Sequence, residues 1–180
     1  DKIKTKGPCA YSEENFLKSL KIPENLKIGI MINAADYVYS KDILSLVQKN
    51  FIIKKKSIIS LVRIACHSNE LELIKPLVNW LKRSGYKVGI NIMQIPELSF
   101  KEIKKSVLLI KKTKADILYF ADSLGSLNSI KTRKIIKNIR LFWKGPMGIH
   151  THDNMGKAME NSIAAINNSV EWIDSTVTGM

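Results

Sequence analysis

Two of the three histidines of this sequence stand two positions apart, in the segment GIHTHDN at residues 148–154. The segment continues an apolar run that is typical of a strand, and side chains alternate between the two faces of a strand. His150 and His152 should therefore project to the same face, about 7 Å apart along the backbone. Two imidazoles placed in this way can bind one divalent cation, whose other ligands, a carboxylate and water, must come from elsewhere. The alternative is a hydrogen-bonded pair of structural histidines.

A second group of polar residues stands in ADSLGSL at residues 121–127. Asp122, Ser123 and Gly125 fall where a strand turns into a helix, so a hydroxyl group and free backbone N–H groups could hold a carboxylate or carbonyl oxygen there. An ordinary turn is the alternative. The remaining histidine, His67, ends another apolar run beside a residue that can cap a helix, and we interpret it as structural.

Six short apolar, β-branched runs carry these residues, and helical patterns separate them. Near-continuous apolar runs are typical of strands buried on both faces of a parallel sheet, and strict alternation with helices is typical of an α/β fold. The expected strands are residues 27–34, 57–67, 87–95, 115–123, 146–154 and 171–180, and the expected helices are 40–50, 69–84, 99–114, 128–143 and 156–168.

Some helix boundaries can be predicted from capping residues. Ser99 with Glu102, and Asn69 with Glu72, have the spacing of capping boxes, which predicts helix starts at both places. Pro76 would then lie inside the second of these helices, where it should bend or break the helix.

The strands recur about every 29 residues, as in the repeating units of a barrel or a doubly wound sheet. A closed eight-unit (β/α) barrel needs about 250 residues, and this sequence supplies about six units. Residues 11–25 read as a helix and a loop, so the chain begins within a unit. We expect one domain over residues 1–180, an incomplete TIM barrel truncated at both ends. A truncated doubly wound sheet is the alternative, although no Gly-x-Gly-x-x-Gly follows any strand.

The composition is that of a soluble globular domain, with 45% hydrophobic and 25% charged residues. No apolar run reaches the roughly 18 residues of a membrane span, so we expect a cytoplasmic protein. The net charge of +13 raises the alternative of a basic module that binds nucleic acid. Because the lysines fall on the polar faces of expected helices and Arg is scarce, we expect neither a nucleic-acid nor a membrane partner.

Taken together, several segments resemble the metal-dependent aldolase and lyase superfamily. This superfamily includes 4-hydroxy-2-oxovalerate aldolase, 3-hydroxy-3-methylglutaryl-CoA lyase, isopropylmalate synthase and homocitrate synthase. The resemblance spans nearly the whole chain and is closest to the 4-hydroxy-2-oxovalerate aldolase branch. The segments that carry it are KGPCAYS (6–12), VRIACHSNE (62–70), ADSLGSL (121–127), GIHTHDNMGKAMENSIAAI (148–166) and WIDSTVTGM (172–180).

The resemblance implies a metal site at the two histidines. His150 and His152 match two ligands of a site for Mn²⁺ or Mg²⁺, and Asp153 and Asn154 match residues that could orient the second ligand. The third ligand of the superfamily is the Asp of an Arg-Asp pair on the first barrel strand, whose Arg stabilises an enolate. No such pair matches in this sequence, and the first two barrel units of the resembled fold are the ones we expect to be missing.

The resemblance also implies a small 2-oxo acid as substrate. Ser123 matches the position that contacts the carboxylate of a pyruvate-like acid, and Asp122 and Gly125 shape its turn. The sequence leaves open the acid or base, the co-substrate, the metal and the direction of the reaction. The full-length parent could be a homo-oligomer.

The implied reaction makes or breaks a C–C bond next to the enolate of pyruvate or a related acid. A Claisen-type condensation of an acyl-CoA with a 2-oxo acid is the alternative within the superfamily. Outside it, the alternatives are the nucleic-acid-binding module and an inactive fragment. We expect the 180-residue chain alone to lack turnover, because about half of the implied site is not in it.

Overall fold

The computed structural model describes residues 7–176. Within this range six parallel strands form one sheet in the order in which they occur in the chain. The strands are β1 (Ile28–Asn33), β2 (Ile59–Cys66), β3 (Lys87–Ile92), β4 (Ile117–Asp122), β5 (Met147–Thr151) and β6 (Trp172–Ile173).

Helices connect the strands, as parallel pairing requires. They are α1 (Glu14–Ser19), α2 (Ala35–Val38), α3 (Ile43–Asn50), α4 (Lys75–Arg83), α5 (Phe100–Lys111), α6 (Ser129–Arg140) and α7 (Ala158–Ile166). Three single 3₁₀ turns, η1 (Pro8–Ala10), η2 (Lys54–Lys56) and η3 (Ile95–Glu97), complete the described elements.

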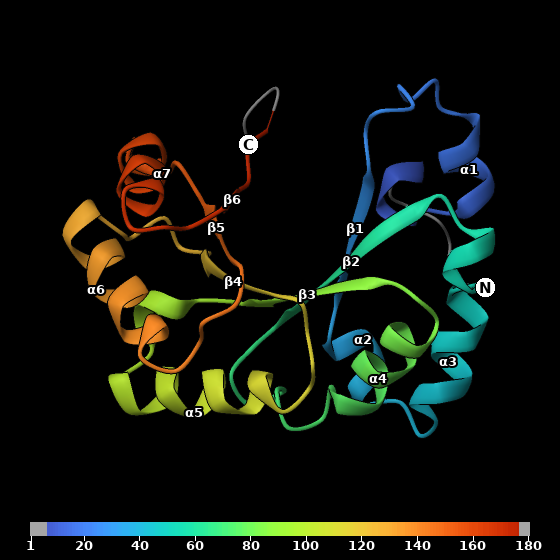
Figure 1. The fold of residues 1–180 in the computed structure, drawn as a ribbon, viewed down its shortest axis with the longest axis horizontal. Helices are drawn as coiled ribbons and strands as arrows, with labels where there is room; N and C mark the ends of the chain where they lie inside the picture. The colour runs from blue at the N-terminus through green and yellow to red at the C-terminus, as the bar shows by residue number, and fades with distance from the viewer. Residues whose placement is uncertain (1–6, 177–180) are drawn as a thin grey trace.

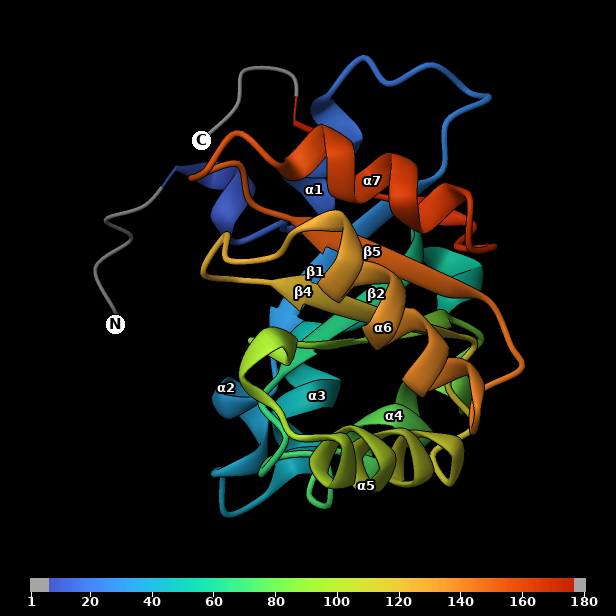
Figure 2. The same ribbon diagram turned by 90° about the vertical axis from the view of Figure 1, so that its left-hand side faces the viewer.

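The sheet is curled, with the helices along its outer side (Figure 1). Figure 2 shows α5, α6 and α7 side by side over this outer side, and the neighbouring helices contact one another. A doubly wound sheet reverses its strand order at a switch point, whereas this sheet keeps the sequential order throughout. The prediction of an incomplete TIM barrel is therefore confirmed, and the doubly wound alternative is wrong.

The core lies between the strands and the outer helices. Every residue of β4, in the middle of the curled sheet, is buried, as the continuous apolar run predicts. In β1, at one edge, burial alternates, because the side chains on its inner side face no further strand among residues 7–176. The curl thus leaves an inner side on which polar residues of several strands can meet.

One predicted helix start is wrong. The sequence predicted a helix over 69–84 that begins at a capping box of Asn69 and Glu72, but α4 begins at Lys75 and turns precede it. Pro76 therefore lies in the first turn of α4, where its missing N–H costs no hydrogen bond, and it neither bends nor breaks the helix. The capping interaction upstream is made by Glu70, whose carboxylate accepts from the His67 backbone N–H at 2.8 Å.

Other boundaries follow the sequence more closely. The capping box of Ser99 and Glu102 is confirmed, with both of its reciprocal hydrogen bonds present at the start of α5. The helix expected over 40–50 corresponds to α3, which the separate short helix α2 precedes. The last expected strand is reduced to β6, and residues 177–180 of that expectation lie outside the described residues.

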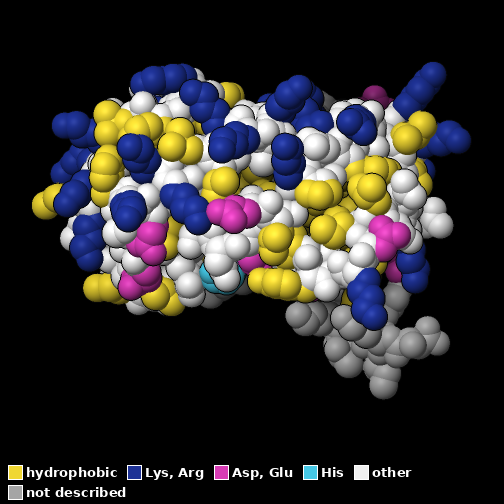
Figure 3. All heavy atoms as spheres, turned by 90° about the horizontal axis from the view of Figure 1, so that it is seen from below, with side chains coloured by type: hydrophobic (Ala, Val, Ile, Leu, Met, Phe, Trp, Pro, Cys, Tyr) yellow, Lys and Arg dark blue, Asp and Glu magenta, His cyan; other side chains and the backbone are white. Residues whose placement is uncertain are grey.

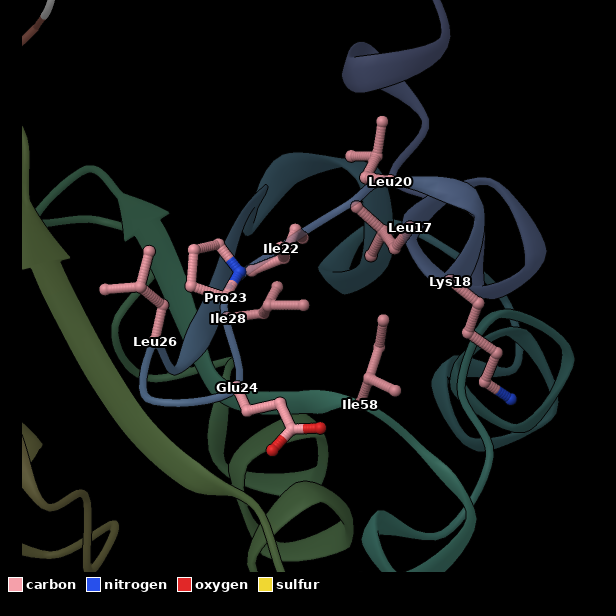
Figure 4. Close-up of a pocket in the computed structure, with 9 residues that line it drawn as sticks. All are labelled: Leu17, Lys18, Leu20, Ile22, Pro23, Glu24, Leu26, Ile28 and Ile58. Carbon is pink, nitrogen blue, oxygen red and sulfur yellow. The ribbon is translucent and has the colours of Figure 1, made fainter.

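A shallow groove of about 250 Å³, lined by apolar side chains together with Lys18 and Glu24, opens at the amino-terminal ends of β1 and β2 (Figure 4). Leu17 of α1, Leu26 in the following loop, Ile28 and Ile58 contribute to its lining. The carboxyl ends of the parallel strands lie at the opposite end of the barrel. This groove is therefore separate from the end of the barrel that carries the two histidines.

Lys and Arg side chains are spread over the face shown in Figure 3, with apolar side chains between them. This distribution agrees with lysines on the solvated faces of helices, as in α5 and α6. Among residues 7–176, no helix has the length and apolar character needed to cross a membrane.

Candidate metal and substrate site

The sheet register decides which side chains share the inner side. His150 of β5 pairs with Ala121 of β4, and Gly148 pairs with Tyr119. Because side chains alternate, Ser123 continues the inner row of β4 and His152 continues that of β5. The predicted histidines and the predicted serine therefore lie at the carboxyl ends of neighbouring strands, where barrel enzymes place reactive groups.

The two histidines meet through their Nε2 atoms, which lie 3.3 Å apart. Their ring planes are inclined at 72°, and both side chains are half-buried. Two nitrogen ligands about 2.1 Å from one ion, and about 90–110° apart at it, would be separated by about 3.0–3.4 Å. The distance between the two Nε2 atoms thus fits two ligands of one cation. It also permits a direct hydrogen bond between the rings, the alternative that the sequence left open.

The other nitrogen of His150 contacts a residue that sequence reasoning missed. Its Nδ1 lies 2.7 Å from Oδ2 of Asp174, which follows β6, and Nη1 of Arg63 in β2 lies 2.6 Å from the same oxygen. A carboxylate on the far nitrogen of a ligating histidine holds the ring in place in metal sites. The only sequence signal for Asp174 was its place in WIDSTVTGM, one of the segments that carry the resemblance.

The surroundings of Asp174 favour its ionised form. Burial by itself would raise the pKa of this carboxyl group, but the hydrogen bond from His150 and the charge and hydrogen bond of Arg63 outweigh burial. The pKa of Asp174 therefore lies below its usual value. The guanidinium of Arg63 also stacks on the ring of Tyr119, 3.8 Å from its centre, and burial raises the pKa of that phenol to about 12.

The turn after β4 is closed by Asp122, which also takes up the backbone N–H groups of Gly125, Ser126 and Leu127, so these are not free to bind a ligand. The carboxylate of Asp122 is fully buried and accepts from the backbone N–H groups of Ser126, at 2.9 Å, and Leu127, at 3.0 Å. Gly125 has φ of +63°, a conformation that favours glycine. Each oxygen of Asp122 thus accepts one hydrogen bond from the turn, and the buried carboxylate shapes the site.

Ser123 keeps its hydroxyl proton available. Its Oγ accepts from the backbone N–H of Gln94 at 3.2 Å, and no other hydrogen bond joins Oγ to any of the described residues. Gln94 itself, two residues after the end of β3, has φ of +52°, an uncommon conformation for a residue other than glycine. The hydroxyl of Ser123 can therefore donate to an anion on the inner side of the sheet.

Asp153 and Asn154 are exposed, and the contacts that they make are with residues other than the two histidines. Asp153 accepts from the backbone N–H of Ala158 at the start of α7, at 2.8 Å, and so acts as a cap. Asn154 packs over Gly125, where an added Cβ would lie 2.9 Å from its side chain. The carboxylate hydrogen-bonded to a candidate ligand is thus that of Asp174, and the role predicted for Asp153 and Asn154 stays a prediction.

Two imidazoles are an incomplete donor set for a divalent cation. Within the described range, no group of three or more His, Cys, Asp and Glu side chains is arranged to hold a metal ion. His67, at the end of β2, makes no side-chain hydrogen bond or ion pair to any other described residue. The distance between the two rings fits two ligands of one cation, and such a cation would need further ligands from other groups.

Fold and site together define a partial parallel (β/α) barrel with paired imidazoles at the carboxyl end of β5. The chain belongs to the HMGL-like family, whose model matches residues 52–180. This family in general depends on a divalent metal.

Known proteins support this assignment. The chain is 24% identical over 175 residues to a 4-hydroxy-2-oxovalerate aldolase of Carboxydothermus hydrogenoformans, covering 97% of this chain and 49% of that protein. It is 28% identical over 110 residues to a homocitrate synthase of Pyrococcus abyssi, covering 61% of this chain and 30% of that protein. The chain thus spans at most about half the length of these relatives.

The fold agrees with that of a solved structure. The hydroxymethylglutaryl-CoA lyase of Pseudomonas aeruginosa matches with a TM-score of 0.72 at 12% identity, over 92% of this chain and 58% of that one. At this identity the likeness supports the barrel fold alone.

Proposed function

We propose that this chain is part of a divalent-metal-dependent aldolase that breaks or forms a C–C bond next to the enolate of pyruvate or a related 2-oxo acid. The observation that carries the proposal is the 3.3 Å approach of the Nε2 atoms of His150 and His152 at the carboxyl end of β5. Similarity to proteins named 4-hydroxy-2-oxovalerate aldolase supports the reaction class.

The residues present can supply three parts of this chemistry. His150 and His152 would hold Mn²⁺ or Mg²⁺, and Asp174 orients the ring of His150. When bound, the cation withdraws electrons from the carbonyl and carboxylate of a 2-oxo acid, which stabilises the enolate. The hydroxyl of Ser123 donates a hydrogen bond to the substrate carboxylate and so fixes the orientation of the acid.

Metal removal tests the proposal directly. The experiment uses the complete polypeptide, that is, the full-length aldolase of which this chain is proposed to be a part. Treated with EDTA and freed of metal, it should release no pyruvate from 4-hydroxy-2-oxovalerate, and Mn²⁺ or Mg²⁺ should restore the release. Pyruvate can be followed by coupling to lactate dehydrogenase, with a metal analysis of the same sample as control. Pyruvate release that persists in protein shown to be metal-free contradicts the proposal.

Ser123→Ala is expected to raise the dissociation constant of pyruvate or of its analogue oxalate about tenfold. A hydrogen bond to a charged group contributes about 1.5–3 kcal/mol. Since about 1.4 kcal/mol changes a dissociation constant tenfold, its loss should cost at least about a factor of ten. Titration calorimetry with oxalate and Mn²⁺-loaded protein measures the change. Ser126→Ala is a matched control on the same turn, because the Ser126 hydroxyl is buried and unpartnered among the residues that the structure describes. Equal constants for the two variants would exclude a carboxylate contact by Ser123.

The similarity to a homocitrate synthase favours a second candidate, the Claisen-type condensation of an acyl-CoA with a 2-oxo acid. The two reactions differ in the co-substrate, which is an aldehyde in the first and a thioester in the second. Release of free coenzyme A from acetyl-CoA and 2-oxoglutarate, without aldol cleavage of 4-hydroxy-2-oxovalerate, would favour the synthase.

A further inference from the structure

One ion pair crosses the inner side of the curled sheet. Arg63 belongs to β2 and Asp174 follows β6, and three strands separate these two in the sheet. Nevertheless Nη1 of Arg63 lies 2.6 Å from Oδ2 of Asp174, with 13% and 25% of the two side chains exposed. The contact exists because the curl of the sheet brings the two strands face to face, so it depends on the barrel geometry.

Both partners of Asp174 use the same oxygen. Nδ1 of His150 lies 2.7 Å from Oδ2, the atom that also accepts from Arg63. An arginine side chain can only donate hydrogen bonds, so the atom that it contacts must be an acceptor. A neutral His150 must then carry its proton on Nδ1, which leaves the lone pair of Nε2 directed towards His152.

We propose that Arg63 is a positioning residue, which holds Asp174 as an acceptor and thereby sets the tautomer and orientation of His150 for metal binding. The inference rests on the proposed function of the histidine pair. Arg63 acts through Asp174 and has no contact with a ligating nitrogen. Its other side-chain nitrogens, Nε and Nη2, are buried without partners among residues 7–176, so the bond to Asp174 is the one polar contact that fixes its guanidinium there.

Packing holds the guanidinium in this position. It stacks 3.8 Å from the centre of the Tyr119 ring, on the inner side of β4. Gly89 of β3 leaves room for both groups, since an added Cβ would lie 3.1 Å from the ring and 3.2 Å from Cγ of Arg63. Asp174 is thus held at Oδ2 by a residue that is itself held in place.

The tautomer of His150 can be read without any metal. Long-range ¹H–¹⁵N NMR of the metal-free, complete polypeptide is expected to show the His150 proton on Nδ1. In Asp174→Asn the amide oxygen must face Arg63, so the proton should stay on Nδ1. In Arg63→Met/Asp174→Asn the amide is free to turn and donate to Nδ1, and the proton should move to Nε2.

Mn²⁺ affinity, measured by calorimetry with the metal alone, gives a second readout. Loss of a group that orients a ligand typically weakens metal binding about ten- to hundredfold, and we expect a loss in this range for Arg63→Met. Arg63→Lys should restore much of the affinity, because it keeps a donor that carries a positive charge. Lys82→Met is the control: Lys82 lies 2.6 Å from Asp116 in a more exposed ion pair that involves neither histidine. It should lower stability and leave Mn²⁺ affinity unchanged.

Two results would overturn the inference. One is a proton on Nε2 of His150 in the metal-free wild type, or in Asp174→Asn while Arg63 is present. The other is a dissociation constant for Mn²⁺ that Arg63→Met leaves at the wild-type value. If the wild type failed to bind Mn²⁺ at all, the proposed function would fall, while the NMR measurement would still decide the role of Arg63.

Discussion

Replacing either His150 or His152 with alanine is expected to abolish measurable Mn²⁺ binding by the complete polypeptide and to stop its aldol cleavage. The two Nε2 atoms lie 3.3 Å apart, and among the described residues no group of three or more His, Cys, Asp and Glu side chains offers an alternative metal site. Because loss of an orienting partner already weakens metal binding about ten- to hundredfold, loss of a ligand should exceed a hundredfold. Calorimetry with Mn²⁺ and the pyruvate assay measure the two effects.

The third histidine supplies the control. His67→Ala removes an imidazole at the carboxyl end of another strand, β2, without touching the pair. It should leave both Mn²⁺ affinity and turnover near the wild-type values. Circular dichroism of all three variants separates a lost ligand from a lost fold, since Asp174 keeps its bond to Arg63 when His150 is shortened. Retained Mn²⁺ binding in both pair variants would show that the rings form a structural hydrogen bond.

The parts of the fold that sequence predicts best are those set by local pattern. Continuous apolar runs predict buried strands, and the run of β4 is indeed buried at every position. The capping box of Ser99 and Glu102 involves residues three positions apart, so its geometry is contained in the sequence itself. The capping-box spacing of Asn69 and Glu72 gave a wrong helix start. Glu70 accepts from the His67 backbone instead, and α4 begins only at Lys75, which places Pro76 in the favourable first turn.

In the candidate site, too, contacts between residues close in sequence can be predicted, whereas contacts between distant residues cannot. His150 and His152 are two residues apart, so strand alternation alone predicts that they share a face. Arg63 and Asp174 are separated by 111 residues, and their contact arises only when the sheet curls. No local pattern distinguishes this Arg from one that faces solvent. Local sequence predicts an orienting carboxylate only at Asp153, next to His152; the structure shows Asp153 at the start of α7, and its orienting role stays a prediction.

Gly148→Ala is expected to destabilise the protein by about 3 kcal/mol, at the upper end of the range for overpacked cores. Gly148 pairs with Tyr119, and an added Cβ would clash with three carbons of the tyrosine ring. The ring is only 1% exposed and has Arg63 stacked on it, so it has little space into which it could move. Urea unfolding followed by circular dichroism measures the loss.

Gly29→Ala is the matched control in β1, because its added Cβ meets Leu61 at an ordinary 3.5 Å. Its stability should stay within about 1 kcal/mol of the wild type, the size of the usual Gly-to-Ala effect in the unfolded chain. If the clash is with the ring, Tyr119→Leu should make room for the methyl group added at position 148, and the double variant should lose less stability than the sum of the single losses. Additive losses would mean that the ring does not lie over Gly148. Because a displaced ring would also shift Arg63, Gly148→Ala should weaken Mn²⁺ binding as well, although residue 148 is not itself a ligand.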